Sequence, residues 1–232
     1  MIAHLVKCMY AEAAHHNPHG DEGAQRVHGH SYKIEVLASG TPGEIGWVED
    51  YAVLGTLLKP IYDQLDHAYL NEVPGLENDT TIHAIERWIM ERIDPRPEWF
   101  DGIRVTIVGD CRLKLIPLPE DNFEHLPDRL RFTFEAAQSL PQLEDGHHCK
   151  CLHGHSYRVE VGVQEMDQLK FHLPAIYDAL DHRYLNEVPG LEISTCEKIS
   201  EWIWNRLVAQ DLKPTIVVIQ ETPTARCLYY GE

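Results

Sequence analysis

Two stretches of this chain alternate apolar and polar side chains with a period of two, which is typical of half-buried β-strands. Each stretch opens on a His-Gly-His triplet, at 28–30 in the first and at 153–155 in the second. The parity of the histidines continues into apolar residues, which are Tyr32, Ile34 and Val36 after the first triplet and Tyr157, Val159, Val161 and Val163 after the second. The pattern therefore predicts two equivalent strands, each with its histidines on the buried face.

Around each of these strands the chain repeats one order of expected elements. In the first half we expect strands at 4–13, 28–36, 102–108 and 112–116, and helices at 53–65 and 80–93. In the second half we expect strands at 131–137, 156–164, 215–220 and 226–230, and helices at 169–180 and 195–207. The helices are predicted from apolar residues three and four apart. Each half is thus predicted to be an α+β unit of order ββααββ, a four-stranded antiparallel sheet with both helices on one face.

The two halves are a tandem duplication. The motif Leu-Asp-His-x-Tyr-Leu-Asn-Glu-Val-Pro-Gly-Leu-Glu occurs at 65–77 and again at 180–192. We place the first domain at 1–118 and the second at 129–232, with a linker rich in proline and acidic residues at 117–128. Because the helices cover only one face of each sheet, we expect the sheets to assemble with other copies into a β-barrel with the helices outside.

Composition narrows the choice of partners. The chain has 232 residues, of which 44% are hydrophobic and 25% charged, as in soluble globular proteins. The N-terminus lacks a signal-peptide layout and no apolar run is long enough to span a bilayer, so we expect a cytoplasmic protein without a membrane partner. The net charge of −17 argues against nucleic acid as a partner, and an anionic small substrate would need local positive charge. The six cysteines show no disulfide-scaffold spacing and are expected to be thiols.

The histidine triplets are candidate metal ligands. Two histidines at i and i+2 of a strand point to the same side, about 7 Å apart along the chain, so both rings can reach one ion. A third nitrogen from a neighbouring strand would complete the ligand set of a catalytic zinc and leave one position open to substrate. The alternative is a pair of hydrogen-bonded core histidines, since His-Gly-His alone is weak evidence.

Several motifs together resemble those of the 6-pyruvoyl- and 6-carboxy-tetrahydropterin synthases. They are Ala-Ala-His at 13–15, Cys-x-x-x-His-Gly-His at 149–155, Leu-Asp-His-x-x-Leu-Asn at 65–71 and 180–186, and Glu-Thr at 221–222. The second half is most similar to the bacterial carboxy-type enzyme of queuosine biosynthesis. The resemblance covers nearly the whole chain, twice, and implies the tunnelling fold (T-fold), in which neighbouring domains form a barrel with active sites between them. It also implies zinc on three histidines, a catalytic Cys, an Asp-His pair and a Glu that anchors the pterin ring.

Carried over residue by residue, the two halves are unequal. The first half keeps a complete zinc set, which consists of His15, His28 and His30. It also keeps the pair Asp66 and His67, but Ala24 replaces the catalytic Cys and Asp110 replaces the anchoring Glu. The second half keeps the catalytic and anchoring residues, which are Cys149, Asp181, His182 and Glu221.

The metal set of the second half is incomplete. His153 and His155 are tentative ligands, but Gln138 stands where the first zinc ligand is expected, and Gln is a poor ligand for zinc. The residues that could substitute for it are Cys149, Cys151, His147 and His148. Because Cys and zinc ligands come from one domain in this family, no single centre is expected to combine Cys149 with the complete zinc set.

The leading interpretation is a zinc-dependent pterin lyase of the 6-carboxytetrahydropterin synthase type. By resemblance the substrate is 7,8-dihydroneopterin triphosphate. Zinc would polarise the side-chain oxygens, Cys149 with an Asp-His pair from an adjoining domain would move protons, and Glu221 would hold the ring. One alternative is another pterin side-chain reaction, run by the zinc of the first half with Asp66, His67 and no thiol. The other is a non-catalytic pterin- or purine-binding protein. The family's barrels contain six domains, so a homo-oligomer of three tandem chains is expected.

Overall fold

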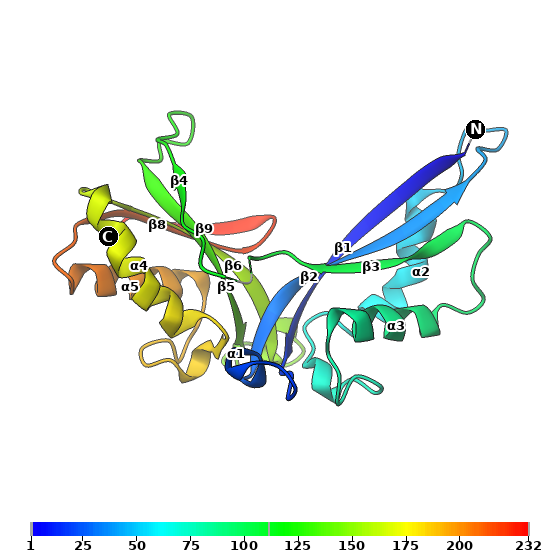
Figure 1. Cartoon of the computed structure of the whole chain (residues 1–232), viewed down its shortest axis with the longest axis horizontal. Coiled ribbons are helices and arrows are strands. Elements are labelled where there is room, and N and C mark those ends of the chain that lie inside the picture. The colour runs from blue at the N-terminus through cyan, green and yellow to red at the C-terminus, as the bar shows by residue number, and fades with distance from the viewer. Residues whose placement is uncertain (1, 111, 232) are drawn as a thin grey trace.

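The two halves of the molecule meet at the ends of their longest strands (Figure 1). The computed structural model describes residues 2–110 and 112–231. The first half is an antiparallel sheet of order β1-β2-β3 with two helices on one face. Its elements in chain order are β1 (Ala3–His15), α1 (Glu22–Gln25), β2 (His28–Gly40), α2 (Tyr51–Tyr62), η1 (Leu70–Glu72), α3 (Ile82–Arg92) and β3 (Phe100–Ile107).

The second half contains a larger sheet of order β4-β5-β6-β8-β9, with β7 parallel to β5. Its strands are β4 (Ile116–Leu118), β5 (Arg129–Gln138), β6 (His153–Val163), β7 (Arg183–Tyr184), β8 (Pro214–Thr222) and β9 (Ala225–Tyr229). Its helices are η2 (His148–Lys150), α4 (Met166–Leu180), η3 (Leu185–Glu187) and α5 (Cys196–Val208). The expected order of strands and helices is thus present in both halves, apart from one strand.

The strand expected at 112–116 is wrong. The chain leaves β3 towards the second half, where the backbone N–H of Asp110 donates to Thr133 Oγ1 at 2.9 Å. The next strand is β4, which pairs with β5 and so belongs to the second sheet. The first sheet therefore has three strands instead of four.

The alternation of apolar and polar residues in the sequence correctly predicts which strand side chains are buried in the two cores. In β2, Tyr32, Ile34 and Val36 are buried against the apolar faces of α2 and α3. Threonines cap the second helix of each half, since Thr81 Oγ1 accepts from Ala84 N and Thr195 Oγ1 accepts from Lys198 N. Each half builds its core in the same way, as expected of a duplication.

The halves come into direct contact where β2 crosses β6. A Cβ on Gly29 would lie 2.3 Å from the Cα of Gly154, so both positions need glycine for the backbones to approach. The next residues on the same face bond reciprocally: Ser31 N donates to Ser156 Oγ and Ser156 N donates to Ser31 Oγ, both at 3.1 Å. These paired contacts relate the halves by a local two-fold axis.

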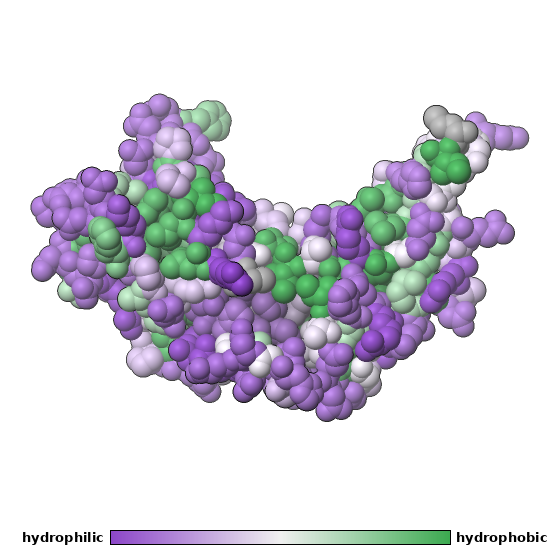
Figure 2. Space-filling view, viewed as in Figure 1, coloured by the Kyte–Doolittle hydropathy of each residue, from purple (hydrophilic) through white to green (hydrophobic). Residues whose placement is uncertain are grey.

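The helices lie on the lower and outer side of the view in Figure 1, and the opposite faces of the sheets look towards the open upper side. Figure 2 shows that the molecule is hollowed on this side, between its two raised ends. This uncovered face carries charge in the first sheet, where Glu35 contacts Arg104 at 2.5 Å and Lys33 at 2.6 Å. Among the described residues, no helix is both long and apolar enough to cross a bilayer.

Candidate active sites

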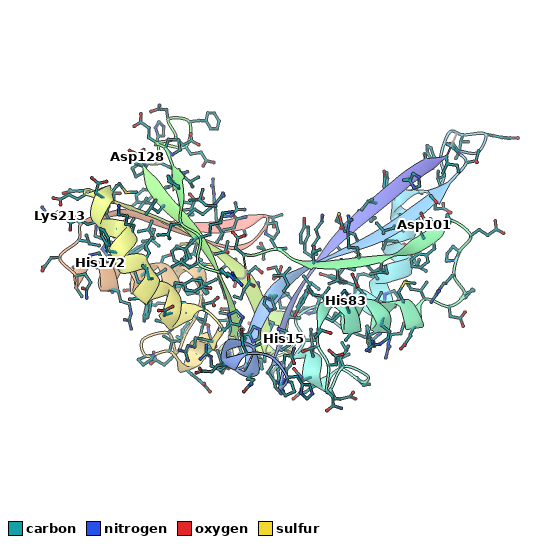
Figure 3. All side chains as sticks on the ribbon, viewed as in Figure 1. His15, His83, Asp101, Asp128, His172 and Lys213 are labelled. Carbon is teal, nitrogen blue, oxygen red and sulfur yellow. The ribbon has the colours of Figure 1, made fainter. Side chains whose placement is uncertain are left out.

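Three histidines of the first half converge near the junction, and we refer to His15, His28 and His30 as the triad. The pairing of β1 with β2 sets His15 opposite His28. One ring nitrogen from each side chain lies within 4.8 Å of the others. Figure 3 shows His15 in the lower middle of the molecule, where the two halves meet.

The rings of the triad are oriented by partners at their Nδ1 atoms. Each Nδ1 atom has a partner, which is Thr80 Oγ1 at 2.9 Å for His15, the Arg26 carbonyl at 2.8 Å for His28 and Glu135 Oε2 at 2.7 Å for His30. Within the described residues the Nε2 atom of His15 is buried and has no hydrogen-bond partner. Burial lowers the pKa of all three rings, to about 3 for His28 and His30, so the imidazoles are neutral. Neutral rings with held outer nitrogens fit a divalent metal ion.

A fourth imidazole reaches the triad from the second half. The ring of His182 lies 4.4 Å from that of His28, and Asp181 Oδ2 lies 2.7 Å from His182 Nδ1. Burial opposes the charged form of His182, but the bond to Asp181 raises its pKa overall. The Asp-His pair beside the triad is therefore Asp181–His182, which corrects the zinc-only interpretation that assigned Asp66–His67 to it.

The second centre is built in the same crossed manner. Cys149 Sγ lies 3.7 Å from His67 Nε2, and Asp66 Oδ2 lies 3.0 Å from His67 Nδ1. His153 completes a group in which one atom of each of Cys149, His67 and His153 lies within 4.8 Å of the others. Each centre thus combines the His-Gly-His strand of one half with the Asp-His pair of the other half.

Glu221 and Gln138 occupy the place where the triad has its third ring. Glu221 Oε1 bonds to the side-chain amide of Gln138 and lies 3.2 Å from Nε2 of His155. Cys196, which the sequence reading did not single out, donates from Sγ to Glu221 Oε2 at 3.7 Å. Among the described residues the Gln138 Oε1 atom is buried without a hydrogen-bond partner. Gln138 and Glu221 thus lie beside the rings of His153 and His155, whereas the converging ligand atoms of the second centre are those of His67, Cys149 and His153.

The other substitutes for the missing ligand lie elsewhere. Cys151 is exposed, and its carbonyl oxygen bonds Nδ1 of His153 at 2.8 Å. His147 caps η2 by accepting from Cys149 N. In the part of the chain that the structure describes, neither of them nor His148 belongs to a group of converging ligand atoms.

Two buried glutamates were missed as members of these centres. Glu135 Oε2 lies 2.7 Å from Nδ1 of His30, and Glu12 Oε2 lies 2.9 Å from Nδ1 of His155. Burial raises the pKa of Glu135 to about 8. The signal was present in the repeat, because Glu-Ala-Ala occurs at 12–14 and again at 135–137.

Asp110 is not the counterpart of Glu221. Ile107 pairs with Tyr32 in the first sheet, and the pairing of Arg158 with Gln220 puts Glu221 opposite Tyr157, which is the counterpart of Tyr32. Ile107 therefore takes the equivalent place, and the side chain of Asp110 is exposed. The resemblance assigned the role of the anchoring Glu to the shorter Asp110, whereas the register of the sheet puts the equivalent position three residues earlier, at Ile107.

Comparison with known proteins identifies the family of the chain. The sequence model of the 6-pyruvoyl tetrahydropterin synthase family matches the chain twice, at residues 5–108 and 129–232. The chain belongs to this family. The predicted family and the α+β T-fold class are thereby confirmed, and the chain is an enzyme of the lyase class.

Relatives whose names give different reactions are similar to this chain. A 6-carboxy-5,6,7,8-tetrahydropterin synthase of Synechocystis is 39% identical over 89 residues, which cover 36% of this chain and 68% of the relative. A dihydroneopterin monophosphate aldolase of Pyrococcus furiosus is 33% identical over 98 residues, which cover 42% of this chain and 74% of the relative. The solved 6-pyruvoyl tetrahydropterin synthase of Caenorhabditis elegans is 20% identical, with a TM-score of 0.39 over 53% of this chain and all of that one.

Proposed function

We propose that the chain is a zinc-dependent pterin lyase of the 6-carboxytetrahydropterin synthase type, with 7,8-dihydroneopterin triphosphate as its substrate. The observation that supports this most is the alignment of Cys149, His67 and Asp66 across the two halves. A thiol, an imidazole and a carboxylate in this order form a proton relay. The similarity to the Synechocystis synthase supports the same choice.

In this proposal Cys149 and His67 move the protons of the pterin side chain. Burial, and then the charge of Glu221, raises the pKa of Cys149, so the resting thiol carries its proton. Asp66 lies at the outer nitrogen of His67 and orients the inner nitrogen towards the sulfur. His67 therefore accepts the thiol proton, and Asp66 stabilises the imidazolium that forms.

Glu221 anchors the pterin ring in the same proposal. A carboxylate can accept two N–H groups from the amino-pyrimidine edge of a pterin. A cavity of about 170 Å³ opens beside Glu221 and is lined in part by Thr133, Ser156 and Arg158. Ring binding would exchange the contacts of Glu221 with Gln138 and Cys196 for contacts with the substrate.

We propose that zinc is held by His15, His28 and His30, and more weakly by His153 and His155. A bound zinc ion supplies Lewis-acid polarisation of substrate oxygens. The triad offers three neutral imidazoles, whereas the second centre has Gln138, a poor zinc ligand, in the position of His15. Among the described residues, His153 converges instead with His67 and Cys149. Beside the triad, Asp181 and His182 are placed to hold a proton.

A second candidate function is the cleavage of a pterin side chain by the triad without a thiol. The composition of the first centre favours it, because Ala24 stands in the place of Cys149 and Ile107 in the place of Glu221. The similarity to the Pyrococcus aldolase supports this candidate.

Turnover of 7,8-dihydroneopterin triphosphate by a Cys149→Ala variant tests the proposal. We expect the variant to lose at least about two orders of magnitude in kcat, because a proton-transfer group is removed. Cys151→Ala is the matched control, since this exposed thiol lies two residues away and should leave the rate unchanged. Unchanged turnover in Cys149→Ala would favour the thiol-free reaction, and a wild-type protein that binds the pterin without turnover would favour a binding protein.

We also propose that three chains assemble into a barrel of six domains, that the protein acts in the cytoplasm, and that its product serves queuosine synthesis. The strands β1 and β3 end the first sheet and offer backbone groups for pairing with another chain. The division into domains at 1–118 and 129–232 is part of this proposal.

A further inference from the structure

The carboxylate of Glu135 lies behind the triad and comes from the other half of the chain. Its Oε2 atom lies 2.7 Å from Nδ1 of His30 and accepts a hydrogen bond from Ser156 Oγ at 2.6 Å. We propose that Glu135 is a positioning residue for the metal ion, because it fixes the tautomer and orientation in which His30 presents its Nε2 atom. The inference rests on the proposed function only in that the triad holds a metal ion.

The surroundings of Glu135 are energetically unfavourable for an isolated carboxylate. Its side chain is 0% exposed, and within the described residues its Oε1 atom has no hydrogen-bond partner. The backbone at Gly109 covers this oxygen so closely that a Cβ there would lie 1.8 Å from it. Burying a carboxylate with so few partners is unfavourable. A divalent cation on the far side of the His30 ring offsets this penalty, because it makes the Nδ1–H group a stronger donor.

The local two-fold axis places a second glutamate in the same way. Glu12 Oε2 lies 2.9 Å from Nδ1 of His155 and accepts from Ser31 Oγ at 2.5 Å. The two serines bond to each other's backbone, so the two carboxylates belong to one buried network. Glu12 is 5% exposed, which is close to the burial of Glu135.

The two glutamates differ in the ring that they hold. Glu135 contacts a member of the complete triad, whereas Glu12 contacts a ring of the centre whose third imidazole is replaced by Gln138. Replacement of either carboxyl group should disturb the network to a similar extent. Only replacement of the Glu135 carboxyl group should weaken metal binding by the triad.

The affinity of the full-length protein for zinc, measured by competition with a chromophoric chelator, tests this inference. We expect Glu135→Gln to lower the affinity of the triad by about tenfold or more. Glu12→Gln is the matched control. Because Glu12 contacts His155 of the other centre, the high-affinity step, which belongs to the triad, should stay within about twofold of the wild type in this variant. With one cobalt ion per chain, bound at the triad, the visible spectrum should change in Glu135→Gln and stay unchanged in Glu12→Gln, a difference that a purely structural role would not produce.

The inference is overturned if Glu135→Gln binds zinc as the wild type does, or if both variants lose affinity equally. Should Glu135→Gln fail to fold, Ser156→Ala and Ser31→Ala provide the same comparison, because each removes one hydroxyl donor from one glutamate. Weaker zinc binding in Ser156→Ala alone would support the inference, and equal binding in both would overturn it. A wild-type protein that binds no metal ion would overturn the proposed zinc dependence as well, whereas metal binding that is insensitive to Glu135 would overturn this inference alone.

Discussion

His67 and His182 each reach from one half into the histidine centre of the other half. Both residues have left-handed backbone conformations, with φ of 54° and 52°. A residue with a Cβ in this region costs about 1–3 kcal/mol. The neighbouring glutamate strands stabilise it, since His67 N donates to the Glu12 carbonyl at 2.8 Å and His182 N donates to the Glu135 carbonyl at 2.6 Å. Strained residues of this kind are concentrated at functional sites, which agrees with the role given to both histidines.

The charge of Glu35 on the uncovered face gives a prediction for pH dependence. Bonds from Arg104 and then Lys33 lower the pKa of Glu35 to about 2. A depressed carboxyl pKa contributes stability that is complete above its unfolded value and is lost as the pH falls towards the folded value. Glu35→Gln should therefore lower the free energy of unfolding by about 1 kcal/mol at pH 7, a modest value because Arg104 is half exposed.

Urea unfolding between pH 7 and pH 3 measures this effect. The gap between wild type and Glu35→Gln should begin to narrow below the ordinary carboxyl pKa. The exposed Glu44, changed to Gln, is the control and should show no such pH-dependent gap. A gap that stays constant over the whole range would contradict the assignment to the charge of Glu35.

At the scale of the elements, the close crossing of β2 and β6 is where an added side chain should lower stability most. Gly29→Ala should lower the free energy of unfolding by about 1–3 kcal/mol, because the new Cβ would meet the backbone of Gly154 and neither strand can move away without breaking its sheet. Thermal unfolding of the two variants side by side measures this. Gly55→Ala in α2 is the control. Its new Cβ would meet only Lys7 Cε, at 3.9 Å, so this substitution should stabilise the helix slightly. Equal stability of Gly29→Ala and wild type would show that the strands approach less closely.

The long elements could be predicted from the sequence because their patterns are local. The parity of the strands and the apolar stripes of the helices repeat over ten or more residues, so errors at single positions do not matter. The strand expected at 112–116 failed because three residues such as Ile116–Leu118 carry no information about which sheet they join. Asp110 was misassigned for a related reason, since only the register of a sheet shows which residue lies opposite Tyr32.

The composition of the centres could be predicted only in part. Motif spacing brings His15, His28 and His30 together, because they lie on adjacent strands of one half. The partners Glu135 for His30 and Glu12 for His155 lie more than a hundred residues away in the sequence. Such contacts depend on how the two halves cross, which the pattern of either half alone does not determine.

At the scale of the whole molecule, the duplicated chain has two unequal centres, and each centre is lined by residues from both halves. The triad has three imidazoles and no counterpart of Cys149 or Glu221, whereas the other centre has Cys149 and Glu221 and carries Gln138 in the position of an imidazole. Each centre needs both halves, so the duplication cannot be divided without destroying both. The close and buried crossing of β2 and β6 holds the two halves in this arrangement.

The proposed assembly makes a prediction at the same scale. Light scattering should give a particle of about three chains, because the outer strands of the sheets are free to pair and the uncovered faces need a partner. Arg104 and Glu35 are placed to face the interior of such a barrel. A stable monomer at all concentrations would contradict the assembly and leave the two centres as described.

The most direct test of the account is the zinc content per chain after dialysis against a weak chelator, measured by elemental analysis for the wild type, His28→Ala and His153→Ala. The account predicts about one tightly held zinc ion per chain, retained in His153→Ala and lost in His28→Ala. A wild-type protein without zinc, or zinc that disappears in His153→Ala and stays in His28→Ala, would contradict it.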